Sequence, residues 1–296
     1  MKRLIYLLAC VIVGLNASAQ LAGVVIDAAS GLPVPYVNLY VLNSQNGATT
    51  DSVGRFSIYD CNPGDTLVVS SIGYVEKKVS LADAGKPILL APKVYEMTEI
   101  NVMPRSYNKQ LVVNKLRKKE VNGYFKSTRP SIVARYFPFR SNYASTGFIK
   151  EIRVFTKSDL PGATFNVRLF LPDSKGEPGG DLLREAVLAE AKKGKDVLRI
   201  DLSEYSLPFP SLGLFVGVEW LMIDRNKKDF VYNEMSTSST VNTYSYDPQF
   251  GSVRRTVFPD TWSYSGGNWH KVVAVNMDDG INKMYFELAV ELTLTN

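Results

Sequence analysis

The chain has 296 residues, of which 45% are hydrophobic and 21% are charged, as in ordinary globular proteins. Its formal net charge of +5 falls to +3 without Lys2 and Arg3, which is too mild for a protein that binds nucleic acid. The single histidine, His270, excludes a histidine-rich metal site and the H-E-x-x-H motif of zinc peptidases.

Residues 1–19 have the pattern of a secretory signal peptide. A short basic start is followed by an apolar run over residues 4–15, and Ala17-Ser18-Ala19 forms a small-x-small cleavage site before Gln20. We therefore expect an exported protein, located in the periplasm, at the outer membrane or outside the cell. No later apolar run is long enough for a transmembrane helix, so any membrane contact would be peripheral.

The two cysteines do not predict a disulfide. Cys10 follows Leu7-Leu8-Ala9, as in a lipoprotein box, but the apolar run before it is too short, and we do not expect lipidation. Without Cys10, Cys61 is the only thiol and has no partner for an internal disulfide. We interpret it as a small, partly buried residue at the end of a strand.

Residues 20–92 contain short apolar runs separated by turns rich in Gly, Pro and Asn, which is typical of a β-sandwich. The most specific stretch is residues 47–58. There Thr50 and Asp51 can stabilise a turn through their side-chain oxygens, Gly54 allows unusual backbone angles, and residues 55–58 alternate like a half-buried strand. We expect the core to contain Val24, Ile26, Val37, Leu39, Val41, Phe56, Ile58, Leu67, Val69, Ile88, Leu89 and Leu90.

Several motifs in this region resemble the carboxypeptidase regulatory-like domain of bacterial envelope proteins. They are Gly23-Val24-Val25-Ile26-Asp27, then residues 31–39 with Pro33 and Pro35, then Thr50-Asp51 with Gly54 and Phe56, and finally residues 65–74 ending in Gly73-Tyr74. The resemblance covers about residues 21–92 and implies a small transthyretin-like β-sandwich. Because that domain has no catalytic residues of its own, the likeness implies a module and no reaction.

Residues 93–130 are expected to link two domains. Residues 95–102 alternate like a strand, and residues 104–130 are rich in Lys and Arg with one acid, Glu120. Tyr107, Leu111, Val112 and Leu116 recur at nearly helical spacing, which predicts a short linking helix. Its basic face is either an ordinary solvated surface or a contact for anionic lipid or glycan.

Residues 131–296 again have the period of two that is typical of strands, with no βαβ alternation. We expect a second antiparallel β-sandwich, jelly-roll-like, in which residues 214–220 form a strand buried on both faces. Through residues 203–220 this part resembles the C-terminal sandwich of secreted bacterial proteins that carry the regulatory-like domain. The predicted fold is therefore all-β: two antiparallel β-sandwiches joined by a short helix.

The candidate binding residues are aromatic and basic side chains in the C-terminal domain. Aromatic residues between Tyr244 and His270 alternate with glycine, aspartate and arginine, a composition suited to stacking on sugar rings or peptides. The residues that we expect to bind a ligand are Tyr246, Arg254, Arg255, Trp262, Tyr264 and Trp269. The alternative is that these aromatic side chains cover the open end of the sandwich core.

No catalytic or cofactor motif stands out, so we predict a non-catalytic protein that binds a glycan or another envelope protein. No G-x-S-x-G accompanies His270, and none of the carboxylate clusters has EF-hand spacing. No cofactor is predicted, although residues 278–282 leave a structural calcium site open beside their interpretation as a hairpin turn. The alternatives are a glycan-active hydrolase with two carboxyl groups converging in a cleft, an accessory subunit of a peptidase or outer-membrane complex, and a purely structural subunit.

Overall fold

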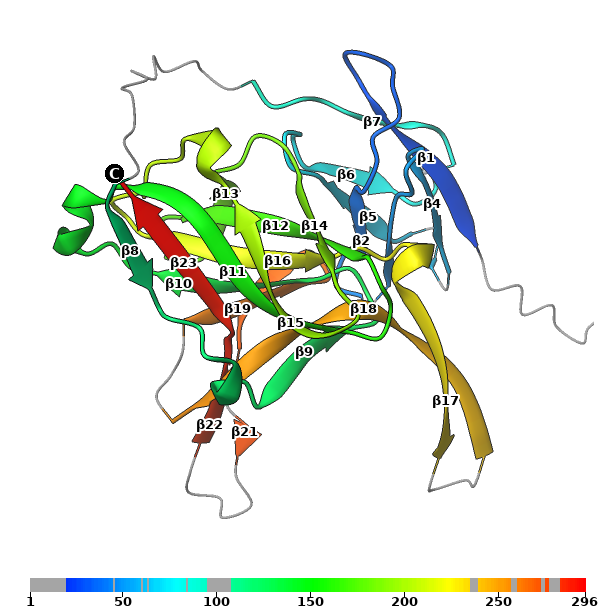
Figure 1. Ribbon diagram of the computed structural model, residues 1–296. Helices are drawn as coiled ribbons and strands as arrows, with labels where there is room; N and C mark the ends of the chain where they lie inside the picture. The colour runs from blue at the N-terminus through cyan, green and yellow to red at the C-terminus, as the bar shows by residue number, and fades with distance from the viewer. Residues whose placement is uncertain are drawn as a thin grey trace, which may run out of the picture.

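The computed structural model describes residues 20–44, 46–59, 61, 62, 64–83, 85–94, 108–234, 239–256, 260–272, 275, 276 and 283–296. Within these residues the protein is all-β, and its strands form two sandwich-like halves that pack together (Figure 1). The helical segments are short 3-10 turns: η1 (Lys118–Glu120), η2 (Ser141–Ser145), η3 (Ser203–Tyr205) and η4 (Asp224–Asn226). A helix with the length and apolar character needed to cross a bilayer is not found in this described part.

The N-terminal half consists of two small sheets, with strand orders β4-β1-β7 and β3-β2-β5-β6. The strands are β1 (Leu21–Asp27), β2 (Asn38–Val41), β3 (Gly47–Thr49), β4 (Arg55–Ile58), β5 (Thr66–Ser70), β6 (Lys77–Ser80) and β7 (Ile88–Leu90). Strand β1 pairs antiparallel with β4 and parallel with β7. The apolar side chains of both sheets meet in one core, as the alternating pattern predicts.

The turn between β3 and β4 forms as its sequence predicts. The Asp51 carboxylate accepts the backbone N–H groups of Val53 and Arg55, both at 2.9 Å. The Thr50 hydroxyl accepts the N–H of Val37 at 2.8 Å. Gly54 has φ +74°, and a Cβ there would lie 2.8 Å from a backbone oxygen of β1. The turn therefore aims Phe56 and Ile58 into the core, where both are buried.

Three of the expected core residues, Val24, Ile26 and Leu89, do not point into the core. In β1 the fully buried side chain is Val25, while Val24 and Ile26 are only half-buried, and in β7 Leu89 is 49% exposed. An uninterrupted apolar run does not show which alternate residues face inward. In β1 the inward set also includes Leu21, which packs on the same core as Val25.

A partly buried hydrogen bond joins the end of β1 to the loop after β5. The Tyr74 hydroxyl donates to Asp27 Oδ2 at 2.8 Å, and Asp27 Oδ1 accepts the N–H groups of Ala29 and Ser30 at 2.7 and 2.9 Å. The Ser30 N–H, followed by the Tyr74 hydroxyl, lowers the pKa of the Asp27 carboxyl. Burial and this hydrogen bond raise the pKa of Tyr74 to about 12. Two distant motifs thus meet in one interaction.

The C-terminal half is a larger sandwich of a seven-stranded and a nine-stranded sheet in the described residues. The first contains β10 (Ile132–Phe137), β12 (Ala163–Pro172), β13 (Pro178–Asp181), β14 (Val187–Ala191), β16 (Leu214–Trp220), β19 (Thr261–Ser265) and β20 (Asn268–Lys271). The second contains β8 (Gln110–Val113), β9 (Gly123–Ser127), β11 (Phe148–Ser158), β15 (Gly194–Asp201), β17 (Lys227–Glu234), β18 (Ser239–Arg255), β21 (Val275–Asn276), β22 (Lys283–Leu288) and β23 (Val290–Thr295). Neighbouring strands in both of these sheets pair antiparallel, as expected for this sandwich.

The predicted linking helix is wrong over the described residues from 108 onward. There the chain forms β8 and β9, with only the short turn η1 between them. β8 extends the larger sheet by pairing with β23, and β9 pairs with β18. Leu111 of β8 packs on the main core, and Leu116, in the connection after β8, packs on a smaller cluster. Tertiary pairing here overrides the local helical spacing.

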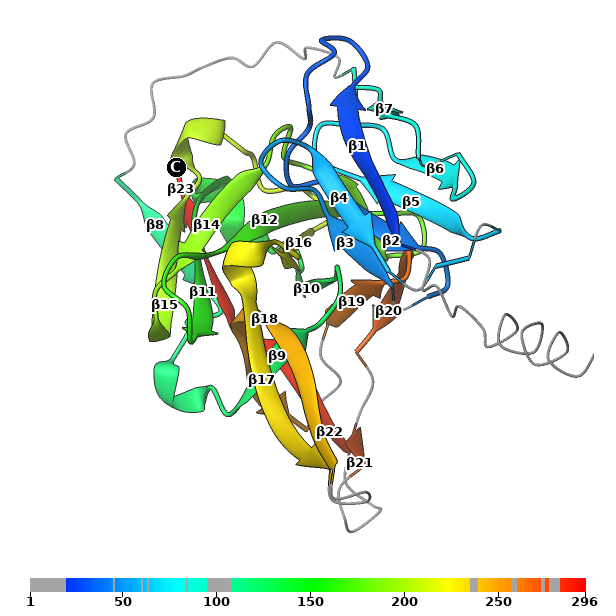
Figure 2. The ribbon, with the colours of Figure 1, turned by 90° about the vertical axis from the view of Figure 1, so that its right-hand side faces the viewer.

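Strand β16 is buried on both faces, as its sequence predicts. The inward set is Leu214, Val216, Val218 and Trp220. The opposite face carries Phe215 and Glu219, and it packs against Tyr40 and Val68 of the N-terminal sandwich. Figure 2 shows β19 and β20 in the same sheet, beyond β10. Tyr40 and Val68 of the N-terminal half are buried in the same cluster as Phe215. The two halves therefore share an apolar contact.

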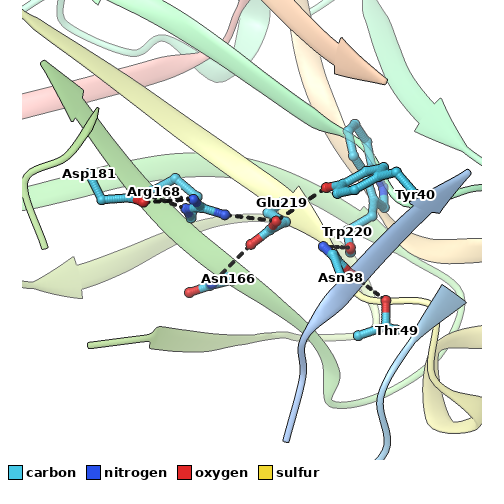
Figure 3. Close-up of polar contacts among 8 residues, drawn as sticks. All are labelled: Asn38, Tyr40, Thr49, Asn166, Arg168, Asp181, Glu219 and Trp220. Carbon is cyan, nitrogen blue, oxygen red and sulfur yellow. Dashed lines mark hydrogen bonds and ion pairs between the residues drawn. The ribbon is translucent and has the colours of Figure 1, made fainter. Parts of the chain in front are cut away.

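A buried polar network surrounds the same contact (Figure 3). Glu219 accepts hydrogen bonds from Arg168 Nη1 at 2.8 Å, from Asn166 Nδ2 at 3.0 Å and, more weakly, from the Tyr40 hydroxyl at 3.5 Å. Arg168 also donates two hydrogen bonds to the Asp181 carboxylate. Burial opposes the charge on Arg168, but Glu219 and Asp181 outweigh it and raise the pKa of the guanidinium. Burial, followed by Glu219, raises the pKa of Tyr40.

Neutral hydrogen bonds continue this contact towards β3 (Figure 3). Asn38 Nδ2 donates to the backbone oxygen of Trp220 at 3.3 Å, and the Thr49 hydroxyl donates to Asn38 Oδ1. The backbone N–H of Met222 donates to Thr49 Oγ1 at 2.8 Å. The domains are thus joined by directional bonds to the strand β16 and the residues just after it.

Several sequence predictions lie outside the described residues. They are the signal peptide at residues 1–19 with Cys10, the strand at residues 95–102, and the turn or calcium site at residues 278–282. Each of these stays a prediction. Cys61 lies within the described residues and is buried in the N-terminal core.

We expect the Asp27–Tyr74 contact to make stability depend on pH. Because folding lowers the pKa of Asp27, its contribution is present above the unfolded pKa of about 3.9 and is lost as the pH falls through the lower folded value. The variant Tyr74→Phe should have a lower urea midpoint than the wild type at neutral pH, and this difference should shrink at acid pH. The control Asp83→Asn changes an exposed carboxylate of the same domain. A difference independent of pH would contradict the assignment.

Glu219→Ala should strongly destabilise the protein because it leaves the Arg168 guanidinium with a buried, partly unpaired charge. We expect a loss of about 3–5 kcal/mol in the free energy of unfolding. Glu190→Ala, which breaks an exposed ion pair with Arg225, should cost less than about 1 kcal/mol. Urea denaturation followed by circular dichroism measures both values, and equal costs would show that the buried network does not stabilise the fold.

Candidate functional site

Two adjoining hollows of about 470 and 390 Å³ lie between the N-terminal sandwich and the base of the β17–β18 hairpin. Both are lined by Ala48, Ser57, Tyr59, Met222, Lys227 and Tyr246. One hollow extends to Thr128 and Tyr244, and the other extends to Arg55 and Asp224. We call these ten residues and the space between them the tyrosine groove.

The strands position the groove residues through their alternation. Phe56 and Ile58 of β4 point into the core, so Ser57 and Tyr59 lie on the exposed side. On the other wall, Tyr244 and Tyr246 are two residues apart on β18, and Tyr246 is opposite Lys227 of β17. β3 and β4 are the outermost strands of their sheets, so the groove runs along an open edge of the N-terminal sandwich. In Figure 1 the base of the hairpin lies below the N-terminal strands.

Tyrosine rings with exposed surface dominate one part of the groove. Tyr59 is 58% exposed and Tyr244 is 44% exposed. The Lys227 ammonium lies 4.9 Å from the centre of the Tyr244 ring, and the Tyr246 ring packs edge-on against the same ring at 5.8 Å. Burial raises the pKa of Tyr246 to about 12, so its phenol is neutral under ordinary conditions. These contacts place the ring surfaces of Tyr244 and Tyr246 beside their own phenol hydroxyl groups in the groove.

The other end of the groove is charged. Asp51 also lines it, but its carboxylate is engaged by the turn between β3 and β4. Arg55 and Asp224 are exposed, and no ion pair in the described part of the chain involves either of them. Their charged groups are therefore available to hydrogen-bond a ligand, whereas Asp51 has a structural role.

The structure does not bring the six candidate residues together. Tyr246 lines the tyrosine groove. Arg255 lies elsewhere on β18, where its Nε donates to Glu287 Oε2 at 2.9 Å, and the adjacent Arg254 is exposed. The remaining three, Trp262, Tyr264 and Trp269, belong to the β19–β20 hairpin.

The three aromatic residues of the β19–β20 hairpin pack at the contact between the two halves. Trp269 meets the Phe170 ring edge-on at 5.2 Å, and Tyr264 meets the Tyr40 ring at 5.1 Å. Trp262 and Trp269 are half-buried and Tyr264 is buried. These side chains pack between the two halves, whereas the alternative to ligand binding placed them over the open end of the sandwich core. Whether any of the six binds a ligand stays a prediction.

Sequence reasoning missed Tyr59, Met222 and Lys227 as members of a site. The signal for Tyr59 was present, because it continues the outward-facing positions of the alternating strand that ends at Ile58. Met222 and Lys227 carry no such signal, since they approach Tyr59 only after the two domains have packed. Among the residues that the structure describes, no group of three or more His, Cys, Asp and Glu side chains is placed to hold a metal ion.

Comparison with known proteins supports the assignment of the N-terminal half. The sequence model of the family described as CarboxypepD_reg-like domain matches residues 21–102, which confirms the resemblance stated above. No curated protein matches the chain.

Two solved structures are similar at a low level. A chain of the T=1 particles derived from infectious bursal virus is 11% identical, with a TM-score of 0.25 and coverage of 93% of this chain. This chain spans 57% of that viral chain. The full-length major pilin SpaD from Corynebacterium diphtheriae is 10% identical, with a TM-score of 0.18, over 96% of this chain and 82% of the pilin. At these TM-scores neither likeness bears on the fold or the function.

The two sets of aromatic residues should differ in their effect on stability. Trp269→Ala removes ring contacts with Phe170 and Tyr264, so we expect a loss of at least about 2 kcal/mol in the free energy of unfolding. Tyr244→Ala removes an exposed ring and should cost less than about 1 kcal/mol. Urea denaturation of the two variants tests this difference. Equal costs would mean that Tyr244 is also a packing residue.

Proposed function

We propose that this protein, whose N-terminal part matches a CarboxypepD_reg-like domain, is an exported, non-catalytic protein that binds glycan in the tyrosine groove. The signal-peptide pattern at residues 1–19 supports export to the periplasm, the outer membrane or the exterior. A module of this family is consistent with a binding or structural role and brings no catalytic residues with it. The observation that carries the proposal is the exposed ring surface of Tyr59 and Tyr244 across one hollow.

The chemistry of the groove suits a sugar. The C–H groups of a pyranose ring are apolar and pack on the flat face of an aromatic ring, while its hydroxyl groups require hydrogen-bonding partners. Tyr59 and Tyr244 offer ring faces, and Arg55 and Asp224 offer charged donors and acceptors in the connected hollow. Arg55 and Tyr244 lie on strands and Tyr59 directly follows one, so the backbone positions of these groups are set before a ligand arrives, which reduces the entropic cost of binding.

Binding should depend on the groove tyrosines. Calorimetry of the chain starting at Gln20 against soluble forms of cellulose, xylan, mannan and chitin and against peptidoglycan fragments should identify at least one ligand. For that ligand, Tyr59→Ala and Tyr244→Ala should each weaken the affinity about tenfold or more, or about 1.4 kcal/mol. The control Phe139→Ala removes an aromatic ring that is 44% exposed outside the groove, and it should bind like the wild type. Unchanged affinity in both tyrosine variants would overturn the site assignment.

The same samples distinguish the rival enzyme. Asp51 and Asp224 both line the groove, and two carboxyl groups in one cleft are the arrangement that a glycan-active hydrolase uses. We expect no increase in reducing ends when the purified protein is incubated with the polysaccharide that it binds. Release of reducing ends that is abolished by Asp224→Asn would establish the hydrolase and reject the non-catalytic proposal.

A further inference from the structure

The tyrosine groove has a shape and a composition that restrict its ligand further, and the following inference rests on the proposed glycan binding. Its two hollows are connected through six shared residues, but each has a separate far end. Each hollow lies within the range of about 300–1,000 Å³ that is typical of pockets for drug-sized molecules. A single sugar ring therefore fills only part of the groove.

The two ends differ in chemistry. Tyr244, with the Lys227 ammonium over its ring, provides a stacking surface at one end. Arg55 and Asp224 provide charged hydrogen-bonding groups at the other end. In the described part of the chain, the one aromatic residue that lines only that end is Phe56, and its ring is buried. In the shared middle, Tyr59 comes from the N-terminal half and Tyr246 from the C-terminal half. A chain lying in the groove would meet different partners along its length.

The floor of the groove belongs to the contact between the two halves. Met222 lines both hollows, and its backbone N–H is the donor to Thr49 Oγ1 at 2.8 Å. Thr49 lines the charged hollow and is bonded in turn to Asn38, which reaches the backbone of Trp220. Both walls and the floor are thus complete only when the two halves are packed together. A ligand that contacts both walls binds the packed arrangement alone.

We infer that the ligand is a linear polysaccharide held along several consecutive sugar units across both domains, rather than a terminal sugar held in one pocket. Stacking on Tyr59 and Tyr244 would hold successive parts of the chain, and Arg55 and Asp224 would bond hydroxyl groups farther along. Because each added sugar gains contacts until both ends are filled, affinity rises with chain length and then becomes constant.

Oligosaccharide series test this inference. Calorimetry is carried out with cello-, xylo-, manno- and chito-oligosaccharides of one to six units, using the intact protein and the variants Tyr244→Ala, Arg55→Ala and, as a control, Lys78→Ala on the exposed strand β6. In the series that binds, the hexasaccharide should bind about tenfold or more tightly than the disaccharide. Tyr244→Ala and Arg55→Ala should each reduce this dependence on length, while Lys78→Ala should leave it unchanged. Circular dichroism confirms that each variant is folded.

The outcomes separate the inference from the function on which it rests. If a monosaccharide or disaccharide binds as tightly as the hexasaccharide and Tyr244→Ala still removes binding, glycan binding stands and the extended-chain inference is overturned. If length dependence persists unchanged in both groove variants, the chain lies elsewhere and the inference is also overturned. If no member of any series and none of the parent polysaccharides binds, the proposed function itself is rejected.

Discussion

The structure depends on one buried carboxylate at the contact between the two sandwiches. Glu219 lies on the outer face of β16 and accepts bonds from Arg168 and Asn166 of the same sheet and from Tyr40 of the other half. A buried acid is costly unless it is paired and hydrogen-bonded. Arg168, itself held by Asp181, provides that pairing. These partners make burial of Glu219 beside Phe215 possible, and they give the contact a specific geometry as well as apolar area.

That geometry has a functional consequence, because the tyrosine groove is assembled from both sides of the same contact. The N-terminal half contributes Tyr59 from the outer side of an edge strand, and the C-terminal half contributes Tyr244 and Tyr246 from β18. Their relative placement follows from the way Asn38 and Thr49 bond to the chain at and just after β16. In the function that we propose, the N-terminal domain therefore provides one wall of the binding site without a reactive group of its own.

The sequence predicts the fold well where alternation is interrupted by turns, and less well where it is not. Phe56 faces the core because the preceding turn sets the phase of its strand. The sequence predicts Val24 and Ile26 in the core, but Val25 lies there instead, since a run of apolar neighbours leaves the phase open. The spacing around Leu111 predicts a helix, because the spacing within a short segment does not show that the distant strand β23 will pair with it. For the site, aromatic residues were recognised by type alone. Burial separates Trp269, which packs between domains, from Tyr59, which stays exposed, and burial arises only from the packing of distant segments.

We expect the two sandwiches to unfold as one cooperative unit, because they share the buried face of β16. Differential scanning calorimetry of the chain starting at Gln20 tests it most directly, because two independent domains of this size melt separately while a coupled pair melts together. A coupled pair should give a single transition whose calorimetric enthalpy equals its van't Hoff enthalpy. Two resolved transitions, with the smaller one assignable to residues 20–94 expressed alone, would contradict it.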